Sequence, residues 1–296
     1  MTANAAPTKG PARELGRFLE IQNLGLNLPF ALAFLLLASN GRPSLWTLLL
    51  IVVAFVAARN AGHSFNRWAD RRFDAANPRT QGRALVTGRT SSAFALGFCA
   101  ANAVVLVVAA YFLNPLAFVL APVALVLVLG YSYTKRVTAF TTAFLGLVQA
   151  ITPAAVYIAV AGTLPVVVLL AVGGLLAWGT AFETIHSLGD VESDRALGLF
   201  SVPVRWGLKA SVAIVPVLHA TAIVLLAIFG LELRLTTAYF VALLAMAILV
   251  AVTDRTLARN PSQARVPFQR HFALSMLYLA GVALAVFVPL GPAWVL

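Results

Sequence analysis

Nine long apolar runs, separated by short polar segments, constrain this chain more than any other feature. They lie at about 24–40, 45–65, 92–113, 115–130, 138–161, 164–186, 210–230, 237–253 and 272–290. A helix needs about 20 apolar residues to cross a hydrocarbon core of about 30 Å, and some of these runs are shorter. We therefore expect about eight to ten crossings. The predicted fold class is all-α, a polytopic membrane bundle of about nine transmembrane helices.

The composition supports a membrane protein and excludes an ordinary soluble globule. Hydrophobic residues make up 61% of the chain and charged residues 10%, whereas soluble domains carry about 25% charged residues. A net charge of +11 would suggest nucleic acid in a soluble protein. In a polytopic chain it reflects the Lys and Arg excess of cytoplasmic loops, so we expect a lipid bilayer as partner and no nucleic acid. The lone Cys99 excludes a disulfide framework and a cysteine-based metal site.

The basic residues also predict an orientation. If the N-terminus is cytoplasmic, all but two of the 21 basic residues lie on the cytoplasmic side, and the two exceptions are Arg42 and Arg234. Residues 1–23 do not resemble a cleavable signal peptide. We therefore expect an integral protein of a bacterial inner membrane, with a cytoplasmic tail (1–20), a single transmembrane domain (21–296) and a cytoplasmic active site.

A polar stripe closes the second apolar run. Asn66, Asp70 and Asp74 follow one another at steps of four, so on a continuous helix they share one face. Two carboxylates beside an amide oxygen form a partial ligand shell that Mg²⁺ accepts when water and phosphate complete it. In a soluble helix such a stripe is usually a solvated face with i,i+4 pairs. At the end of a membrane helix charge is costly and marks function, so we predict a metal site here.

A second acidic stripe closes the sixth apolar run. Glu183, Ser187, Asp190 and Asp194 follow at steps of three or four, with His186 at the edge of their face. Each stripe is followed by a loop that carries Pro and Arg. Two such stripes predict a pair of Mg²⁺ ions that hold a diphosphate from both sides and neutralise the charge that develops on the leaving group.

These motifs resemble those of the UbiA superfamily of intramembrane prenyltransferases, over nearly the whole chain. The similar segments are Asn66-x3-Asp70-x3-Asp74 with Asn77-Pro78-Arg79-Thr80 and Arg83, Asp190-x3-Asp194 with Gly198 and Ser201-x-Pro203-x-Arg205-x-Gly207, Tyr131-Ser132-Tyr133-Thr134-Lys135-Arg136, and Leu28-Pro29-Phe30-Ala31. The nearest branch is that of the 4-hydroxybenzoate polyprenyltransferases, including the relative in the futalosine route to menaquinone.

The resemblance implies Mg²⁺-dependent transfer of a prenyl chain from a polyprenyl diphosphate to an aromatic quinone precursor. The metal would be held by Asn66, Asp70, Asp74, Asp190 and Asp194. The expected catalytic residues are Asp70, Asp74, Asp190, Asp194 and Glu183. The expected substrate-binding residues are Arg59, Asn66, Arg79, Arg83, Tyr131, Lys135, Arg136 and His186.

Several positions depart from the family pattern near the expected acceptor. Glu183 stands in place of the usual Asp and His186 in place of a Tyr, while Asn23 and the pair Thr141 and Thr142 occupy places where His is expected. We therefore expect unchanged donor chemistry with an altered or unassigned acceptor.

Several alternatives stay open for individual residues. Glu183 is either a base or orienting group for the acceptor or a buried partner of Arg59, and Arg136 is either a substrate contact or a membrane anchor. His186 is as well explained by an acceptor contact as by a structural role. For the remaining histidines we expect structural roles: His63, His219 and His271.

Other functions compete with the quinone-precursor interpretation. Within the superfamily, the acceptor could be of the haem, chlorophyll or lipid type. A membrane transporter would distribute its charges through the depth of several helices, whereas here the acidic residues gather at predicted cytoplasmic helix ends. A phosphatidyl transferase would carry an Asp-Gly-x2-Ala-Arg series, which the sequence lacks.

Overall fold

The computed structural model describes residues 24–261 and 265–288, and every element in these ranges is a helix. The helices are α2 (Leu24–Ala38), α3 (Leu45–Ala69), α4 (Arg71–Ala76), α5 (Ser92–Leu113), α6 (Pro115–Thr134), α7 (Thr141–Ala161), α8 (Val168–Ser187), α9 (Val191–Ala196), α10 (Val202–Glu232), α11 (Thr237–Arg259) and α12 (Arg265–Phe287). The predicted all-α fold class is confirmed. The predicted tail (1–20) and Asn23 lie outside the described residues.

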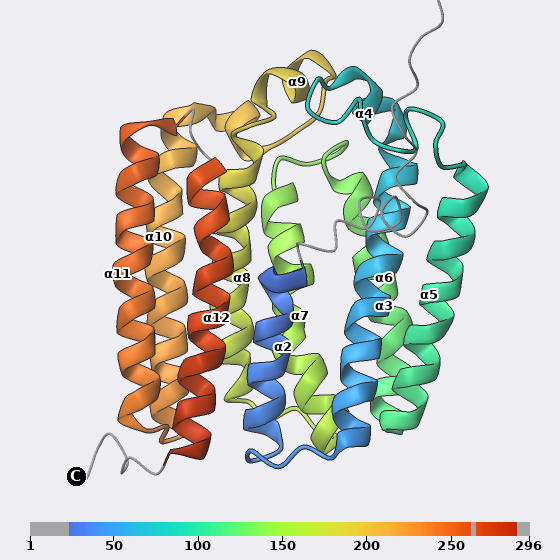
Figure 1. The fold of residues 1–296 in the computed structure, drawn as a ribbon. Coiled ribbons are helices and arrows are strands. Elements are labelled where there is room, and N and C mark those ends of the chain that lie inside the picture. Colours follow the sequence, from blue (N-terminus) through green and yellow to red (C-terminus); the bar gives the residue numbers. More distant parts are fainter. Residues whose placement is uncertain (1–23, 262–264, 289–296) are drawn as a thin grey trace, which may run out of the picture.

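The long helices run roughly side by side in a single bundle (Figure 1). Helices α8, α10, α11 and α12 stand on one side, α3, α5 and α6 stand on the other, and α2 and α7 lie between the two groups. The short helices α4 and α9 both lie at the same end of the bundle. The ends of α3 and α8 that carry the acidic motifs therefore face the same side.

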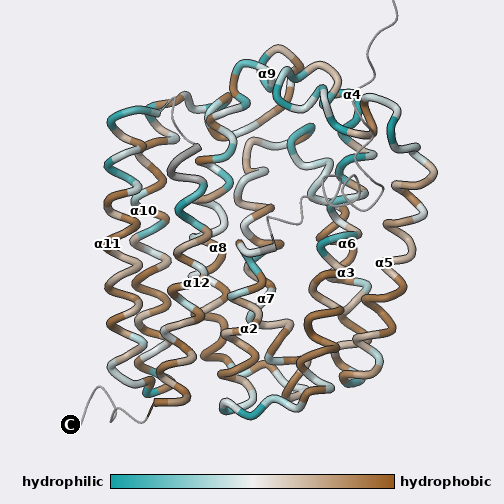
Figure 2. The backbone as a smooth tube through the Cα atoms, viewed as in Figure 1, coloured by the Kyte–Doolittle hydropathy of each residue, from teal (hydrophilic) through white to brown (hydrophobic). Residues whose placement is uncertain are grey.

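Eight of the described helices are long and apolar enough to cross a membrane, and the described part of α2 is a shorter apolar helix. Figure 2 shows the hydrophobic residues along the length of the bundle and the hydrophilic residues concentrated over α4, α9 and the loops beside them. The prediction of an integral membrane protein with about nine spans is confirmed.

The seventh predicted span differs from the helix found there. We expected a loop with Pro and Arg up to residue 209 and a span from 210, but α10 begins at Val202. Pro203 is accepted there because the first turn of a helix does not use its N–H. The backbone then breaks at Gly207, whose φ of 84° suits glycine. The apolar run therefore predicts the span but not the helical turn before the break.

The bundle packs closely where α7 meets α8. Gly146 and Gly179 face each other so tightly that a Cβ added to Gly179 would lie 2.9 Å from the Cα of Gly146. A Cβ on Gly146 would lie 2.6 Å from the hydroxyl of Thr180 and 2.7 Å from its backbone nitrogen. Small residues permit such close approach between membrane helices. This contact brings the next turns of the two helices, with Gln149 and Glu183, alongside each other.

Gly146→Ala should lower the free energy of unfolding by about 1 to 3 kcal/mol, because the added methyl group forces α7 and α8 apart. The matched control is Gly97→Ala in α5, where an added Cβ meets no atom within 4 Å. Replacing glycine by alanine in an open helix position leaves stability equal or slightly higher. Denaturant unfolding in detergent micelles measures both, and equal behaviour of the two variants would contradict the tight contact.

Candidate functional site

A cavity of about 670 Å³ opens between the two halves of the bundle. At the end nearest α4 and α9 it is lined by charged and amide side chains, including those of both acidic motifs. Towards the opposite end its walls are apolar, with Leu106, Leu113 and Ala117 from α5 and α6. The cavity thus has one strongly polar end and one hydrocarbon end.

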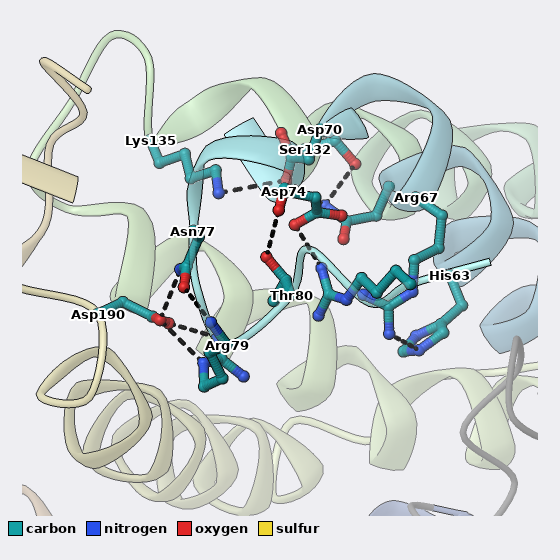
Figure 3. Close-up of polar contacts among 12 residues, drawn as sticks. His63, Arg67, Asp70, Asp74, Asn77, Arg79, Thr80, Ser132, Lys135 and Asp190 are labelled. Atoms are coloured by element: carbon teal, nitrogen blue, oxygen red, sulfur yellow. Dashed lines mark hydrogen bonds and ion pairs between the residues drawn. The ribbon is translucent and has the colours of Figure 1, made fainter. Parts of the chain in front are cut away.

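The first acidic motif lies at the polar end of the cavity. Asp70 accepts a hydrogen bond of 2.8 Å from the amide nitrogen of Asn66 and pairs with Lys135 at 3.3 Å and Arg136 at 3.2 Å. Asp74 is buried and pairs with Arg83 at 2.5 Å. The Lys-Arg loop after α6 therefore reaches the end of α3, as Figure 3 shows for Lys135.

The second acidic motif is joined to the first across the cavity. Arg79 binds both carboxylate oxygens of Asp190, with its Nε at 2.9 Å from Oδ1 and its Nη2 at 2.6 Å from Oδ2. Asn77 donates a further bond of 3.0 Å to Oδ1 of Asp190 and accepts one from the backbone of Arg79. Figure 3 shows these side chains converging. The two motifs predicted to act together are in contact.

Neither motif lies on one continuous helix, so the predicted stripes are wrong in detail. Helix α3 ends at Ala69, and Asp70 caps it with φ −92° and ψ 4° before α4 begins. Asp190 adopts a similar conformation between α8 and α9. The backbone N–H of Asp74 still bonds the carbonyl of Asp70, and that of Asp194 the carbonyl of Asp190. At each break the backbone changes direction and runs across the mouth of the cavity. The two aspartates of each motif stay one helical turn apart.

The surroundings move the pKa values of the second aspartate pair in opposite directions. Burial by itself would raise the pKa of Asp190, but the hydrogen bonds and charge of Arg79, with the bond from Asn77, hold it below its ordinary value. Burial raises the pKa of Asp194 to about 6, with repulsion from Asp190 and Asp70 added and the attraction of Lys135 and Arg79 opposed to it. Asp190 is thus ion-paired with Arg79, whereas Asp194 has no ion pair within the described part of the chain.

The remaining predicted residues form the walls of the cavity below its polar end. Arg59, Tyr131 and His186 line it. Glu183 accepts a hydrogen bond of 2.9 Å from Gln149, and its other oxygen lies 3.5 Å from Nδ1 of His186. All residues proposed for metal, donor or acceptor therefore border the cavity or, in the case of Arg136, contact Asp70, and their roles stay predictions.

Two cavity residues, the buried Arg67 and the half-buried Gln149, were not predicted from the sequence. Arg67 was counted as a loop cation, but its side chain lines the cavity with Nη2 at 3.2 Å from Nε2 of His63. The pattern that could have revealed Arg67 is its spacing. Arg59, His63 and Arg67 follow at steps of four along α3 and so share one face of the helix. Gln149 carried no local signal, because one amide in an apolar run does not reveal which helix it faces.

Two other histidines pair away from the cavity. His219 is buried with Nδ1 at 2.8 Å from Asp254 and Nε2 at 3.2 Å from Nε2 of His271. These three residues join α10, α11 and α12, and none of them lines the cavity. This geometry fits the structural role expected for both histidines.

The carboxylates suit a hard divalent cation only together with a ligand. Within residues 24–261 and 265–288, no three His, Cys, Asp or Glu side chains gather closely enough to hold a metal ion by themselves. The aspartates form two pairs on opposite sides of the cavity mouth. Oxygen donors in pairs suit Mg²⁺ when phosphate oxygens complete its shell. The donor set therefore fits Mg²⁺ bound with a phosphorylated substrate.

The chain resembles known proteins over most of its length. Residues 27–277 match the model of the UbiA prenyltransferase family. A 4-hydroxybenzoate octaprenyltransferase of Aeromonas hydrophila is 31% identical over 84% of this chain and 86% of that protein. The corresponding protein of Nitrosomonas eutropha is 30% identical over 84% and 87%.

Solved structures share the fold. The apo structure of a UbiA homologue from Aeropyrum pernix matches with a TM-score of 0.81 and 28% identity, and covers 88% of this chain and 97% of that one. A UbiA homologue from Archaeoglobus fulgidus bound to GPP and Mg²⁺ matches with a TM-score of 0.70 and 20% identity over 91% and 99%. The second likeness concerns the fold alone.

Asp194→Asn should stabilise the protein at pH 7.5 in the presence of a chelator, by about 1 to 3 kcal/mol. The folded state favours the protonated form of Asp194, so its stabilising contribution is present at low pH and is lost as pH rises from about 4 through 6. The neutral amide removes that loss. Unfolding free energies of wild type and variant at pH 4.5 and 7.5 measure the effect, and a difference that does not grow with pH would contradict it.

Proposed function

The chain belongs to the UbiA prenyltransferase family, and we propose that it transfers a prenyl chain from a polyprenyl diphosphate to an aromatic quinone precursor, with Mg²⁺. The observation that carries this proposal is the contact of Asn77 and Arg79 with Asp190. This contact joins Asn77 to Asp190, which lies 113 residues further along the chain. It brings the two acidic motifs together at the polar end of a cavity whose other end is apolar. An amphiphile with a charged head and a hydrocarbon tail matches that cavity.

The donor would place its diphosphate among the four aspartates and four cations of the polar end. Mg²⁺, when bound through Asn66, Asp70, Asp74, Asp190 and Asp194, supplies positive charge that stabilises the departing diphosphate. Arg79, Arg83 and Lys135 would bind phosphate oxygens that the metal leaves open. The tail would lie along the apolar walls of α5, α6 and α7, and the allylic carbon bonded to the diphosphate would lie where the polar and apolar ends meet.

The acceptor would bind between α3 and α8. Arg59 makes one wall of the cavity basic, while Glu183 supplies a carboxylate from the opposite wall. Glu183 would accept a proton or hydrogen bond from a hydroxyl group on the acceptor ring, which raises the nucleophilic character of the ring carbon. Arg59 would bind an acidic substituent. His186, which lies beside Glu183, would contact the same ring.

We further propose that the site opens to the cytoplasm of a bacterial cell and that the protein lies in its inner membrane. The bacterial relatives named above support this location. The orientation is supported by the basic residues, since the two on the predicted outer side, Arg42 and Arg234, lie in loops at the bundle end opposite α4 and α9.

Asp70→Asn and Asp190→Asn should each abolish Mg²⁺-dependent transfer, with a loss of about 10³-fold or more, because both carboxylates hold charge at the leaving group. The assay supplies a labelled prenyl diphosphate and a panel of aromatic acceptors to purified protein and identifies products by mass spectrometry. Size-exclusion profiles in detergent control for folding. Turnover at the wild-type rate in either variant would refute the assigned roles.

Glu183→Gln should change the KM for the acceptor by about tenfold while the KM for the donor stays constant, since one hydrogen-bond acceptor is replaced by an amide. The same panel decides the nature of the acceptor. Efficient conversion of 4-hydroxybenzoate alone would contradict an altered acceptor. A selective loss of donor affinity in Glu183→Gln would contradict the position of Glu183 at the acceptor.

A further inference from the structure

The first turn of α7 carries a buried hydroxyl that the proposed function leaves unused. Thr142 is 4% exposed, lines the cavity, and its Oγ1 has no hydrogen-bond partner among the described residues. Helix α7 is 21 residues long, and the residue before its first turn, Phe140, provides no side-chain cap. The first N–H groups of such a helix have no partners within it. Buried polar groups are nearly always paired, so an unpaired hydroxyl at this turn points to a ligand.

Ser201 presents a second hydroxyl of the same kind. It is 2% exposed, lines the same cavity, and its Oγ also has no partner within residues 24–261 and 265–288. Ser201 precedes α10 but does not cap it, whereas Ser44 and Ser91 each accept a backbone N–H of their own helix. Pro203 removes one N–H that a cap would use. The Ser201 hydroxyl is therefore available to bind a group other than the N-terminus of its own helix.

The two hydroxyls come from segments that meet at Lys135. The backbone N–H of Phe200 donates to the carbonyl of Lys135 at 2.7 Å, and that of Leu199 donates to the carbonyl of Asp194 at 2.8 Å. The rings of Phe140 and Trp206 pack with centroids 5.4 Å apart, which joins the start of α7 to the first turn of α10. Two unpaired donors thus border the same cavity as Lys135.

We propose that Thr142, Ser201 and the N-terminus of α7 form a subsite for a phosphate group, and that the occupant is the diphosphate of the donor. The subsite offers hydroxyl and backbone N–H donors beside the cation of Lys135, a combination that binds phosphate oxygens. It lies next to Asp194, which the proposed function assigns to Mg²⁺. This subsite rests on the proposed function and adds to it the contacts that orient the leaving group independently of the metal.

The test measures binding of inorganic pyrophosphate with Mg²⁺ to the purified protein in detergent by calorimetry. Ser201→Ala and Thr142→Val should each weaken binding by about tenfold, because each removes a hydrogen bond to a charged ligand. Their melting temperatures should equal that of wild type, since neither hydroxyl has a partner among the residues that the structure describes. Thr142→Ser, which keeps the hydroxyl, should bind as wild type does.

Two capping serines provide matched controls with the opposite pattern. Ser44→Ala and Ser91→Ala remove hydroxyls that cap α3 and α5, so they should lower the melting temperature and leave pyrophosphate binding unchanged. Wild-type affinity in both Ser201→Ala and Thr142→Val would overturn the subsite. A weaker affinity that accompanies an equal fall in melting temperature would overturn it as well.

A second arm distinguishes the donor from a lipid headgroup. Nanodiscs of phosphatidylcholine with added phosphatidic acid replace the detergent. Binding of phosphatidic acid to wild type and to the same variants is then measured. Loss of phosphatidic acid binding with unchanged pyrophosphate binding would overturn the assignment to the donor. If wild-type protein bound no pyrophosphate at all, the proposed function itself would be refuted. Equal binding by wild type and variants would instead overturn only the subsite.

Discussion

Charged side chains at the ends of membrane helices need partners, and in this protein the partners come from other parts of the bundle. Asp190 at the end of α8 is paired with Arg79 from the loop after α4, and Asp70 at the end of α3 with the cations that follow α6. Burying a carboxylate without such a partner is expensive. These pairs therefore hold three loops together over the cavity, and the geometry of the site depends on them.

The cavity beneath those loops is charged at one end and apolar at the other. At its charged end Asp74 and Asp190 are paired with Arg83 and Arg79, and Asp70 with Lys135 and Arg136. Its apolar end offers a hydrocarbon tail an environment like that of lipid. Between them, Arg59 on α3 and Glu183 on α8 face the same space with opposite charge, which suits a small ring with an acidic and a protic substituent. The proposed donor and acceptor would thus share one cavity.

Local spacing predicted which residues lie together at the cavity but not the conformation of their backbone. The steps of four from Asn66 to Asp74 placed both aspartates at the cavity, yet the helix breaks at Asp70, because the polar segment leaves the bundle and turns across its end. Arg67 looked like a loop cation because a count of charges ignores which helix face they occupy. The pairing of Gln149 with Glu183 depends on the close contact of Gly146 with Gly179, which involves two helices and leaves no pattern in either one.

The amino-acid sequence by itself determined that the chain crosses a membrane many times and that its acidic motifs stand at helix ends, because hydropathy and helical spacing are local properties. It also carried the motifs by which the family is recognised. Only the tertiary structure decided that Asp190 meets Arg79 and that Thr142 and Ser201 border the same cavity. Such meetings depend on how helices pack over long separations in the chain, and packing is set by the shapes of all the surfaces in contact together.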